Sequence, residues 1–294
     1  MDEDTTQIIG RFCRESGFFE RGGVMTDLDG TALVERDGRL MISYAVELAL
    51  FEIASHRPIV FNTLRFPRSV LDAFARVWLQ TSRRDVALVA LNGTSLGHLS
   101  ATGYRELAAF PLERTEIDEV LEGIEGLVEN EVRDLLLFIY PRDWERGEII
   151  WTPDAVRHSE IAAKFPSASS VDSGALPALR SRLHAEPICM LHVRIDTPYD
   201  HTPAFQRVRP SEFITHAHTD KLSGAAAMAD LLGFELESSI GAGDTPLDAF
   251  LSTMGLAVHV GPLSLEHKGR FATLKAETPE DFGAILQALI RHGA

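Results

Sequence analysis

The chain has 294 residues, of which 45% are hydrophobic and 24% charged, and its formal net charge is −15. This is the composition of an ordinary globular protein, long enough for one large domain or two of ordinary size. The acidic balance argues against a nucleic-acid binder, which would carry a basic stripe, and against docking on an anionic membrane surface. An anionic small molecule remains a possible ligand if a local site supplies cations or a metal.

Cys13 and Cys189 are the only cysteines, and they lie far apart without metal-ligand spacing. No disulfide framework is expected from such a pair. The N-terminus lacks the basic start and apolar run of a signal peptide, and no apolar stretch approaches the roughly 20 residues that span a bilayer. We therefore expect a soluble protein of the reducing cytoplasm, a monomer or homodimer without nucleic-acid or membrane partners.

The first third of the chain alternates strand-like and helix-like segments. Apolar runs at 24–26, 58–63 and 86–91 predict buried strands, and segments 43–55 and 68–81 predict the helices between them. This order is typical of a parallel sheet covered by helices, in which ligands bind at the carboxyl ends of the strands. A polar residue stands at or just after each of these strand ends: Asp27, Thr63 and Asn92.

The pattern changes between residues 98 and 213, and we interpret this stretch as an inserted α+β domain. It contains expected helices at 115–130 and 175–184, expected strands at 135–140 and 187–194, a turn around 148–151 and a Ser-rich loop at 167–173. The strand–helix alternation then resumes, so residues 1–97 and 214–294 are predicted to form one Rossmann-like α/β core domain with helices on both faces. Its later elements are an Ala-rich helix at 221–232, a strand at 234–240, a helix at 245–253, a strand at 257–260 and a helix at 278–291.

The sequence Asp27-Leu-Asp-Gly-Thr directly follows the first strand. Two carboxylates two residues apart at a strand end can converge on one cation and one reacting group, and Gly30 permits a sharp turn there. A polar loop capped by an aspartate is the simpler interpretation. A calcium-binding EF-hand loop fails on register, because its first and twelfth positions would be Met25 and Arg36, which do not ligate calcium.

Three later pieces stand where a phosphate site would need them. Thr63 can donate its hydroxyl to a phosphate oxygen, although it could merely cap the next helix. Lys221 opens the Ala-rich helix, so its ammonium and the helix N-terminus can face one anion, although a lysine there is commonly a surface residue. Asp244 and Asp248 are one helical turn apart and can share a face, although Asp244 could simply be an N-cap.

Taken together, these pieces resemble the four motifs of the haloacid dehalogenase (HAD) superfamily, in order: Asp27/Asp29, Thr63, Lys221 and Asp244/Asp248. The insertion between the second and third motifs is similar to a C2-type cap and indicates subgroup IIB. That subgroup contains the Cof-type phosphatases and the sucrose-, trehalose- and mannosylglycerate-phosphate phosphatases. The resemblance covers most of residues 20–260, with specific motifs only in the core. Two departures argue against the Cof branch: Leu64 replaces the usual glycine of the second motif, and Leu247 replaces the usual asparagine of the fourth.

The resemblance implies a Mg²⁺-dependent phosphatase that acts on a small phosphorylated metabolite, with a sugar phosphate as the favoured class. It implies that Asp27 is the nucleophile and Asp29 the general acid and base. Lys221 and Thr63 would bind the phosphoryl oxygens. Asp27, the Asp29 carbonyl, Asp244 and Asp248 would hold or orient the Mg²⁺. A HAD-fold protein that binds a phosphorylated ligand without turnover is the alternative, and a phosphotransferase is a further one.

His216-Ala-His218-Thr-Asp220 imitates part of the metal-binding string of metallo-β-lactamases, but Lys221 stands where that string has a histidine. We interpret the two histidines as alternate residues of a strand that leads to Lys221. Within the insertion, aromatic and basic side chains could stack on and hydrogen-bond a sugar. The candidates are Arg142, Trp144, Trp151, His192, Arg194 and Arg207.

Overall fold

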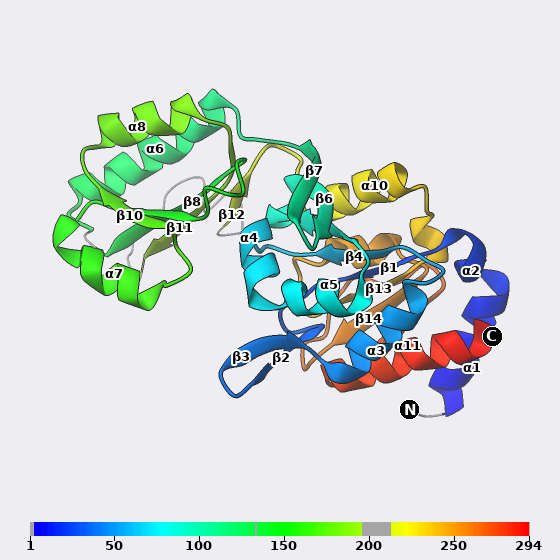
Figure 1. The fold of residues 1–294 in the computed structure, drawn as a ribbon. Helices are drawn as coiled ribbons and strands as arrows, with labels where there is room; N and C mark the ends of the chain where they lie inside the picture. Colours follow the sequence, from blue (N-terminus) through cyan, green and yellow to red (C-terminus); the bar gives the residue numbers. More distant parts are fainter. Residues whose placement is uncertain (1–2, 133, 196–212, 294) are drawn as a thin grey trace. The chain divides into compact units, whose positions relative to one another are not determined.

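The computed structural model describes residues 3–132, 134–195 and 213–293 (Figure 1). The chain divides into two compact units, residues 1–108 with 220–294, and residues 109–219. We call them the core unit and the inserted unit. In the described part of the chain, no helix combines the length and apolar character needed to cross a membrane.

The core unit is built on an eight-stranded sheet with the order β15-β14-β13-β1-β4-β5-β6-β7. From β15 to β5 all neighbouring strands are parallel, whereas β6 runs antiparallel to β5. The strands are β1 (Val24–Thr26), β4 (Ile59–Asn62), β5 (Val86–Ala90), β6 (Ser95–Ser100), β7 (Gly103–Ala109), β13 (Ile240–Gly243), β14 (Leu256–Val260) and β15 (Ala272–Ala276).

The five central parallel strands are buried along their whole length. Continuous burial is expected where helices cover both faces of a parallel sheet. Figure 1 shows α10 (Lys221–Leu232) on one side of the sheet and α3 (Tyr44–Ile53) with α11 (Pro279–Gly293) on the other. The remaining core helices are α1 (Glu3–Glu15), α2 (Phe18–Arg21), α4 (Pro67–Val70) and α5 (Arg76–Ser82), and a hairpin of β2 (Leu33–Arg36) and β3 (Arg39–Ile42) follows β1.

The inserted unit is a second sheet with helices packed on it. Its strand order is β10-β9-β8-β11-β12, with a parallel β9–β10 pair and antiparallel pairs elsewhere. Helices α6 and α8 bury an apolar cluster against one face of this sheet. The elements are α6 (Arg114–Glu129), β8 (Leu135–Pro141), β9 (Ile149–Thr152), α7 (His158–Lys164), β10 (Ser170–Ser173), α8 (Leu176–Ala185), β11 (Ile188–Ile195) and β12 (Phe213–Thr215).

The limits of the insertion differ from the expected 98–213. Residues 98–108 belong to β6 and β7, which extend the core sheet, and β12 belongs to the sheet of the inserted unit. A change from parallel to antiparallel pairing occurs at β6, and the sequence pattern changes there for that reason. The change of pattern therefore marks the last strands of the core rather than the start of the insertion.

Four local predictions are wrong. The strand expected at 234–240 is a short 3-10 turn at Leu236–Ser238, and the strand begins only at Ile240. The helix expected from residue 245 is a short 3-10 segment, Ala249–Thr253. The expected turn around 148–151 and Ser-rich loop at 167–173 contain β9 and β10, which pair with each other.

Candidate active site

Asp27 and Lys221 meet at the carboxyl edge of the core sheet. Asp27 directly follows β1, and its backbone N–H donates to the carbonyl of Ala242 on the neighbouring β13 at 2.9 Å. Lys221 is the first residue of α10, whose N-cap is Asp220. The Lys221 Nζ donates to Asp27 Oδ1 and to Asp248 Oδ1, at 2.7 Å in each case. Both side chains are buried, so the ion pair is shielded from solvent.

Asp248 organises the loop that follows β13. Its Oδ2 accepts hydrogen bonds from the backbone N–H groups of Asp244 and Thr245, at 3.0 and 2.9 Å. Its Oδ1 accepts from Lys221, so this fully buried carboxylate is satisfied on both oxygens. These bonds fold residues 244–248 into a loop instead of the helix expected there.

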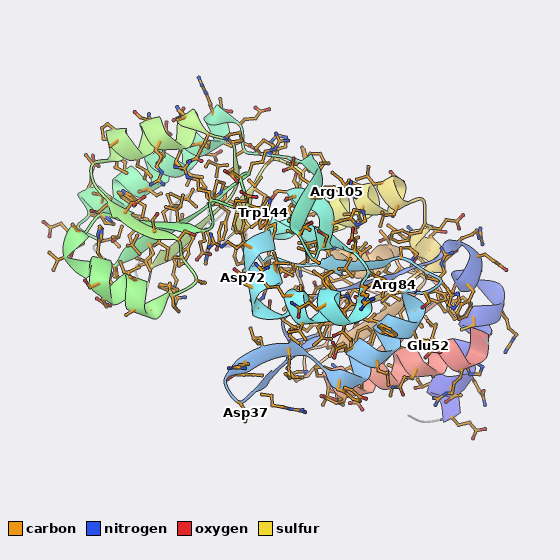
Figure 2. The ribbon with its side chains drawn as sticks, viewed as in Figure 1. Asp37, Glu52, Asp72, Arg84, Arg105 and Trp144 are labelled. Carbon is orange, nitrogen blue, oxygen red and sulfur yellow. The ribbon has the colours of Figure 1, made fainter. Side chains whose placement is uncertain are left out.

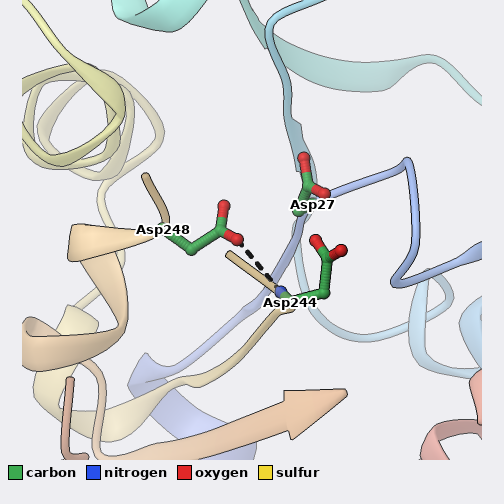
Figure 3. A group of neighbouring side chains, drawn as sticks. All are labelled: Asp27, Asp244 and Asp248. Atoms are coloured by element: carbon green, nitrogen blue, oxygen red, sulfur yellow. Dashed lines mark hydrogen bonds between the residues drawn. The ribbon is translucent and has the colours of Figure 1, made fainter. Parts of the chain in front are cut away.

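Asp244 completes a group of three carboxylates with Asp27 and Asp248 (Figure 3). One oxygen from each lies within 4.8 Å of the others, which is a spacing that a single cation can bridge. Gly30 has a φ of 76°, and a Cβ there would lie 2.1 Å from Asp244 Oδ2. Only glycine therefore lets the Asp27–Thr31 turn approach Asp244 so closely.

Lys221 binds only Asp27 and Asp248 of the three carboxylates, so the group has more negative than positive charge. Burial raises the pKa of Asp27 to about 7, with further increases from Asp248 and Asp244, even though Lys221 opposes the shift. Burial and the nearby Asp248 also raise the pKa of Asp244. Oxygen ligands of this kind suit a hard divalent cation such as Mg²⁺, and its charge would relieve the repulsion. The donor set therefore fits the metal that the sequence resemblance implies.

Asp29 lies apart from this group. Its carboxylate is bound on both oxygens by Arg65, with Nε to Oδ2 at 2.7 Å and Nη2 to Oδ1 at 2.6 Å. Arg65 lies between the expected phosphate-binding Thr63 and the start of α4. No pattern in the sequence pairs these two residues, because 36 positions separate them.

Thr63 is buried at the end of β4, and its hydroxyl accepts a hydrogen bond from the Arg65 N–H at 3.1 Å. Beside it, the Asn62 side-chain amide donates to the Lys221 carbonyl at 2.9 Å and so ties α10 to the sheet. This role of Asn62 was missed at the sequence level. An asparagine at the end of a buried strand is the signal that could have found it, since a buried amide requires partners.

A left-handed loop, Leu91–Gly93, supports the start of α10. All three residues have positive φ values, 51°, 57° and 93°. A Cβ on Gly93 would lie 2.0 Å from the Asp220 carbonyl oxygen, and one on Gly224 would lie 2.7 Å from the Gly93 Cα. Two glycines therefore allow α10 to pack directly on this loop, and the packing sets the position of Lys221.

The two histidines before Lys221 are not alternate strand residues, because β12 ends at Thr215. His216 Nδ1 lies 3.0 Å from Glu116 Oε2, and His218 has a left-handed φ of 62°. Of the candidate sugar-binding residues, Trp151 is buried in the apolar cluster below α6. Arg207 lies outside the described residues.

The fold resembles solved structures of phosphatases. A phosphatase of the haloalkanoate (HAD) enzyme superfamily from Bacteroides thetaiotaomicron matches with a TM-score of 0.64 and 19% identity, over 93% of this chain and 95% of that chain. A HAD subclass IIB sugar phosphatase matches with a TM-score of 0.61 and 15% identity, over 92% and 99% of the two chains. A haloacid dehalogenase-like hydrolase from B. subtilis matches with a TM-score of 0.64 and 16% identity, over 90% and 98%.

No protein-family model and no curated protein sequence matches the chain. At these identities the structural matches establish the fold. The expected α/β HAD core with an inserted α+β unit is therefore confirmed. Among folds of this class, the chain has the architecture of the HAD phosphatases with a large insertion before the lysine-bearing helix.

Proposed function

We propose that the protein is a metal-dependent phosphatase that hydrolyses a small phosphorylated metabolite through a phosphorylated Asp27. The observation that carries this proposal is the buried Asp27 carboxylate, which Lys221 contacts at 2.7 Å beside Asp244 and Asp248. A buried carboxylate with a raised pKa and a specific charge partner is a frequent mark of a functional site. The HAD-phosphatase fold supports the same assignment.

Asp27 acts as the nucleophile in this scheme. A carboxylate oxygen of Asp27 attacks phosphorus, a bond forms between that oxygen and phosphorus, and the bond from phosphorus to the leaving alkoxide breaks. Lys221 stabilises the negative charge that accumulates when a phosphate group approaches Asp27. The Thr63 hydroxyl at the neighbouring strand end donates to a phosphoryl oxygen.

Asp29 handles the protons. In its protonated form it donates a proton to the leaving alkoxide. As a carboxylate it then accepts a proton from the water that attacks phosphorus, and the bond between phosphorus and the Asp27 oxygen breaks to release inorganic phosphate and restore the Asp27 carboxylate. Asp27, Asp244 and Asp248, with the Asp29 carbonyl, would hold a Mg²⁺ ion, which would supply charge neutralisation for the phosphoryl group. Asp248 also keeps the 244–248 loop and the Lys221 ammonium in place through the hydrogen bonds described above.

In this proposal the inserted unit, residues 109–219, determines which leaving group the enzyme accepts. A sugar phosphate is the favoured substrate class. Chain connectivity supports this role, because the chain returns from the inserted unit at Asp220, directly before Lys221. One face of its sheet also carries interacting aromatic and basic side chains. His192 stacks on Phe138 with ring centroids 5.3 Å apart, and the Arg194 guanidinium lies 5.7 Å from the Phe165 ring. Such groups suit a polyhydroxylated ligand.

The direct test is hydrolysis of p-nitrophenyl phosphate with Mg²⁺ and with excess chelator. We expect activity with the metal, little activity in chelator, and none in Asp27→Asn. A variant with Asp244→Asn should need far more Mg²⁺ for the same rate. Full activity of Asp27→Asn would overturn the assignment. Binding of phosphate by the wild type without any hydrolysis would favour the alternative, a ligand-binding protein without turnover.

A further inference from the structure

Asp29, which the proposed reaction needs as its proton donor, is bound by Arg65 in this structure. Arg65 binds both carboxylate oxygens of Asp29, at 2.6 and 2.7 Å. The planar fork of a guanidinium fits a carboxylate and a phosphate equally well. Asp29 and an incoming phosphoryl group would therefore compete for the same donors.

Groups other than Asp29 also hold Arg65 in place. Its backbone N–H donates to the Thr63 hydroxyl at 3.1 Å, and its carbonyl accepts from the Leu91 N–H at 3.2 Å. Its Nη1 donates to Ser69 Oγ at 3.3 Å. The Arg65 side chain is 22% exposed, whereas the Asp29 side chain is 53% exposed. Asp29 is thus the partner that can swing away while the guanidinium stays.

The charges around Asp27 point the same way. The site has four carboxylates, those of Asp27, Asp29, Asp244 and Asp248. In the described part of the chain, the cationic side chains bonded to them are Lys221 and Arg65. Lys221 is enclosed between two carboxylates at 2.7 Å and has little freedom to change partners. A guanidinium stays protonated in proteins, so Arg65 is a cation whichever partner it binds. Arg65 is therefore the cation with an exchangeable partner.

We propose that Arg65 changes partners during catalysis. It holds the ionised Asp29 in the free protein and takes the phosphoryl oxygens of the substrate when these reach Asp27. The released Asp29 then takes up a proton from solvent and turns toward the leaving group. Arg65 is then a substrate-binding residue, and the ion pair keeps the proton donor withdrawn until a phosphate arrives. This inference rests on the function proposed above.

Binding of inorganic phosphate, measured by calorimetry in the presence of Mg²⁺, tests the exchange. Asp29→Ala removes the competing carboxylate, so it should bind phosphate about tenfold tighter than the wild type. Arg65→Gln should bind it about tenfold or more weakly, since it loses the charge-assisted hydrogen bonds to the phosphate. The double variant Asp29→Ala/Arg65→Gln should bind phosphate no more tightly than Arg65→Gln alone. Asp72→Ala is the matched control, because Asp72 is an exposed aspartate paired with Arg76 on the following helical segment (Figure 2).

Two outcomes would overturn the exchange. One is phosphate binding by Asp29→Ala that is no tighter than that of the wild type or of Asp72→Ala. The other is a tightening that persists undiminished in the double variant, which would reflect lost negative charge alone. Arg65→Lys keeps the charge without the fork, and should raise the KM for p-nitrophenyl phosphate more than it lowers kcat. If Arg65→Gln does not fold, Arg65→Met, which also removes the cation, takes its place in the double variant.

The exchange and the proposed function can fail separately. A wild type that binds phosphate and hydrolyses p-nitrophenyl phosphate, but shows no tightening in Asp29→Ala, refutes the exchange and leaves the phosphatase standing. A wild type that neither binds phosphate nor hydrolyses the ester refutes both.

Discussion

Replacing Asp27 by asparagine should abolish activity and yet stabilise the metal-free protein. The substitution keeps the shape of the side chain and an oxygen that can accept from Lys221, whose other partner, Asp248, is unchanged. It removes a carboxylate that is 5% exposed and lies beside two other carboxylates. The protein therefore loses an unfavourable buried charge while it retains most of the contacts.

The size of the effect follows from the pKa of Asp27, which burial raises from 3.8 to about 7. Because the folded protein holds this proton to a higher pH than the unfolded chain, ionisation favours unfolding as the pH rises. The loss of folding free energy caused by the ionised Asp27 is absent below about pH 4, grows between about pH 4 and 7, and is constant above about pH 7. At about 1.36 kcal/mol per pKa unit, the stability gained by Asp27→Asn at pH 8 is on the order of 4 kcal/mol.

Urea unfolding in excess chelator at pH 4 and pH 8 measures this difference. We expect equal free energies of unfolding at pH 4, and a more stable variant at pH 8. Saturating Mg²⁺ should then stabilise the wild type more than the variant, because the ion binds the folded state through Asp27. A variant less stable than the wild type at pH 8 in chelator, or a gain of equal size at both pH values, would refute the reasoning.

Three further substitutions probe the supports of the site. Lys221→Met leaves two buried carboxylates without their cation, so unfolding experiments at pH 8 in chelator should show a loss of about 3–5 kcal/mol. Gly224→Ala pushes α10 away from Gly93, and should cost about 1–3 kcal/mol of stability together with a fall in kcat, whereas Gly126→Ala, at a position with open space, should cost neither. Glu116→Gln should lower the unfolding free energy at pH 7 by about 1–3 kcal/mol, since the Glu116 carboxylate accepts from Glu113 N, His216 Nδ1 and Ala217 N. Although burial alone would raise the Glu116 pKa, these bonds lower it, so that loss should fade as the pH falls below about 4.

The convergence of Asp27, Lys221, Asp244 and Asp248 could be predicted because it depends on local signals. Each residue stands at the end of an apolar run or at the start of a helical pattern, and the ends of parallel strands share one edge of the sheet. The structure places all four together at that edge. Their roles in metal binding and catalysis stay predictions.

The elements that were missed depend on partners far away in the sequence. β13 contains Gly241 and Gly243, which favour no strand, and it becomes one because β1 and β14 pair with it on either side. Conversely, the alternating residues before Ile240 look like a strand, but Ser239 Oγ donates to the Glu235 carbonyl and helps close a turn. β10 is similar: its Ser-rich sequence is a strand only because β9 pairs with it.

An acidic protein can still take an anionic substrate because the relevant charges are local. When all four are ionised, the carboxylates of Asp27, Asp29, Asp244 and Asp248 outnumber the two cations Lys221 and Arg65 by two, so the site carries two uncompensated negative charges. One divalent cation would supply that difference, and a phosphate would then meet a site without net repulsion. Removing the metal should therefore weaken phosphate binding even if Lys221 and Arg65 are intact. The net charge of −15 has little influence on this balance, because charges beyond about 10 Å are screened at 0.1 M salt.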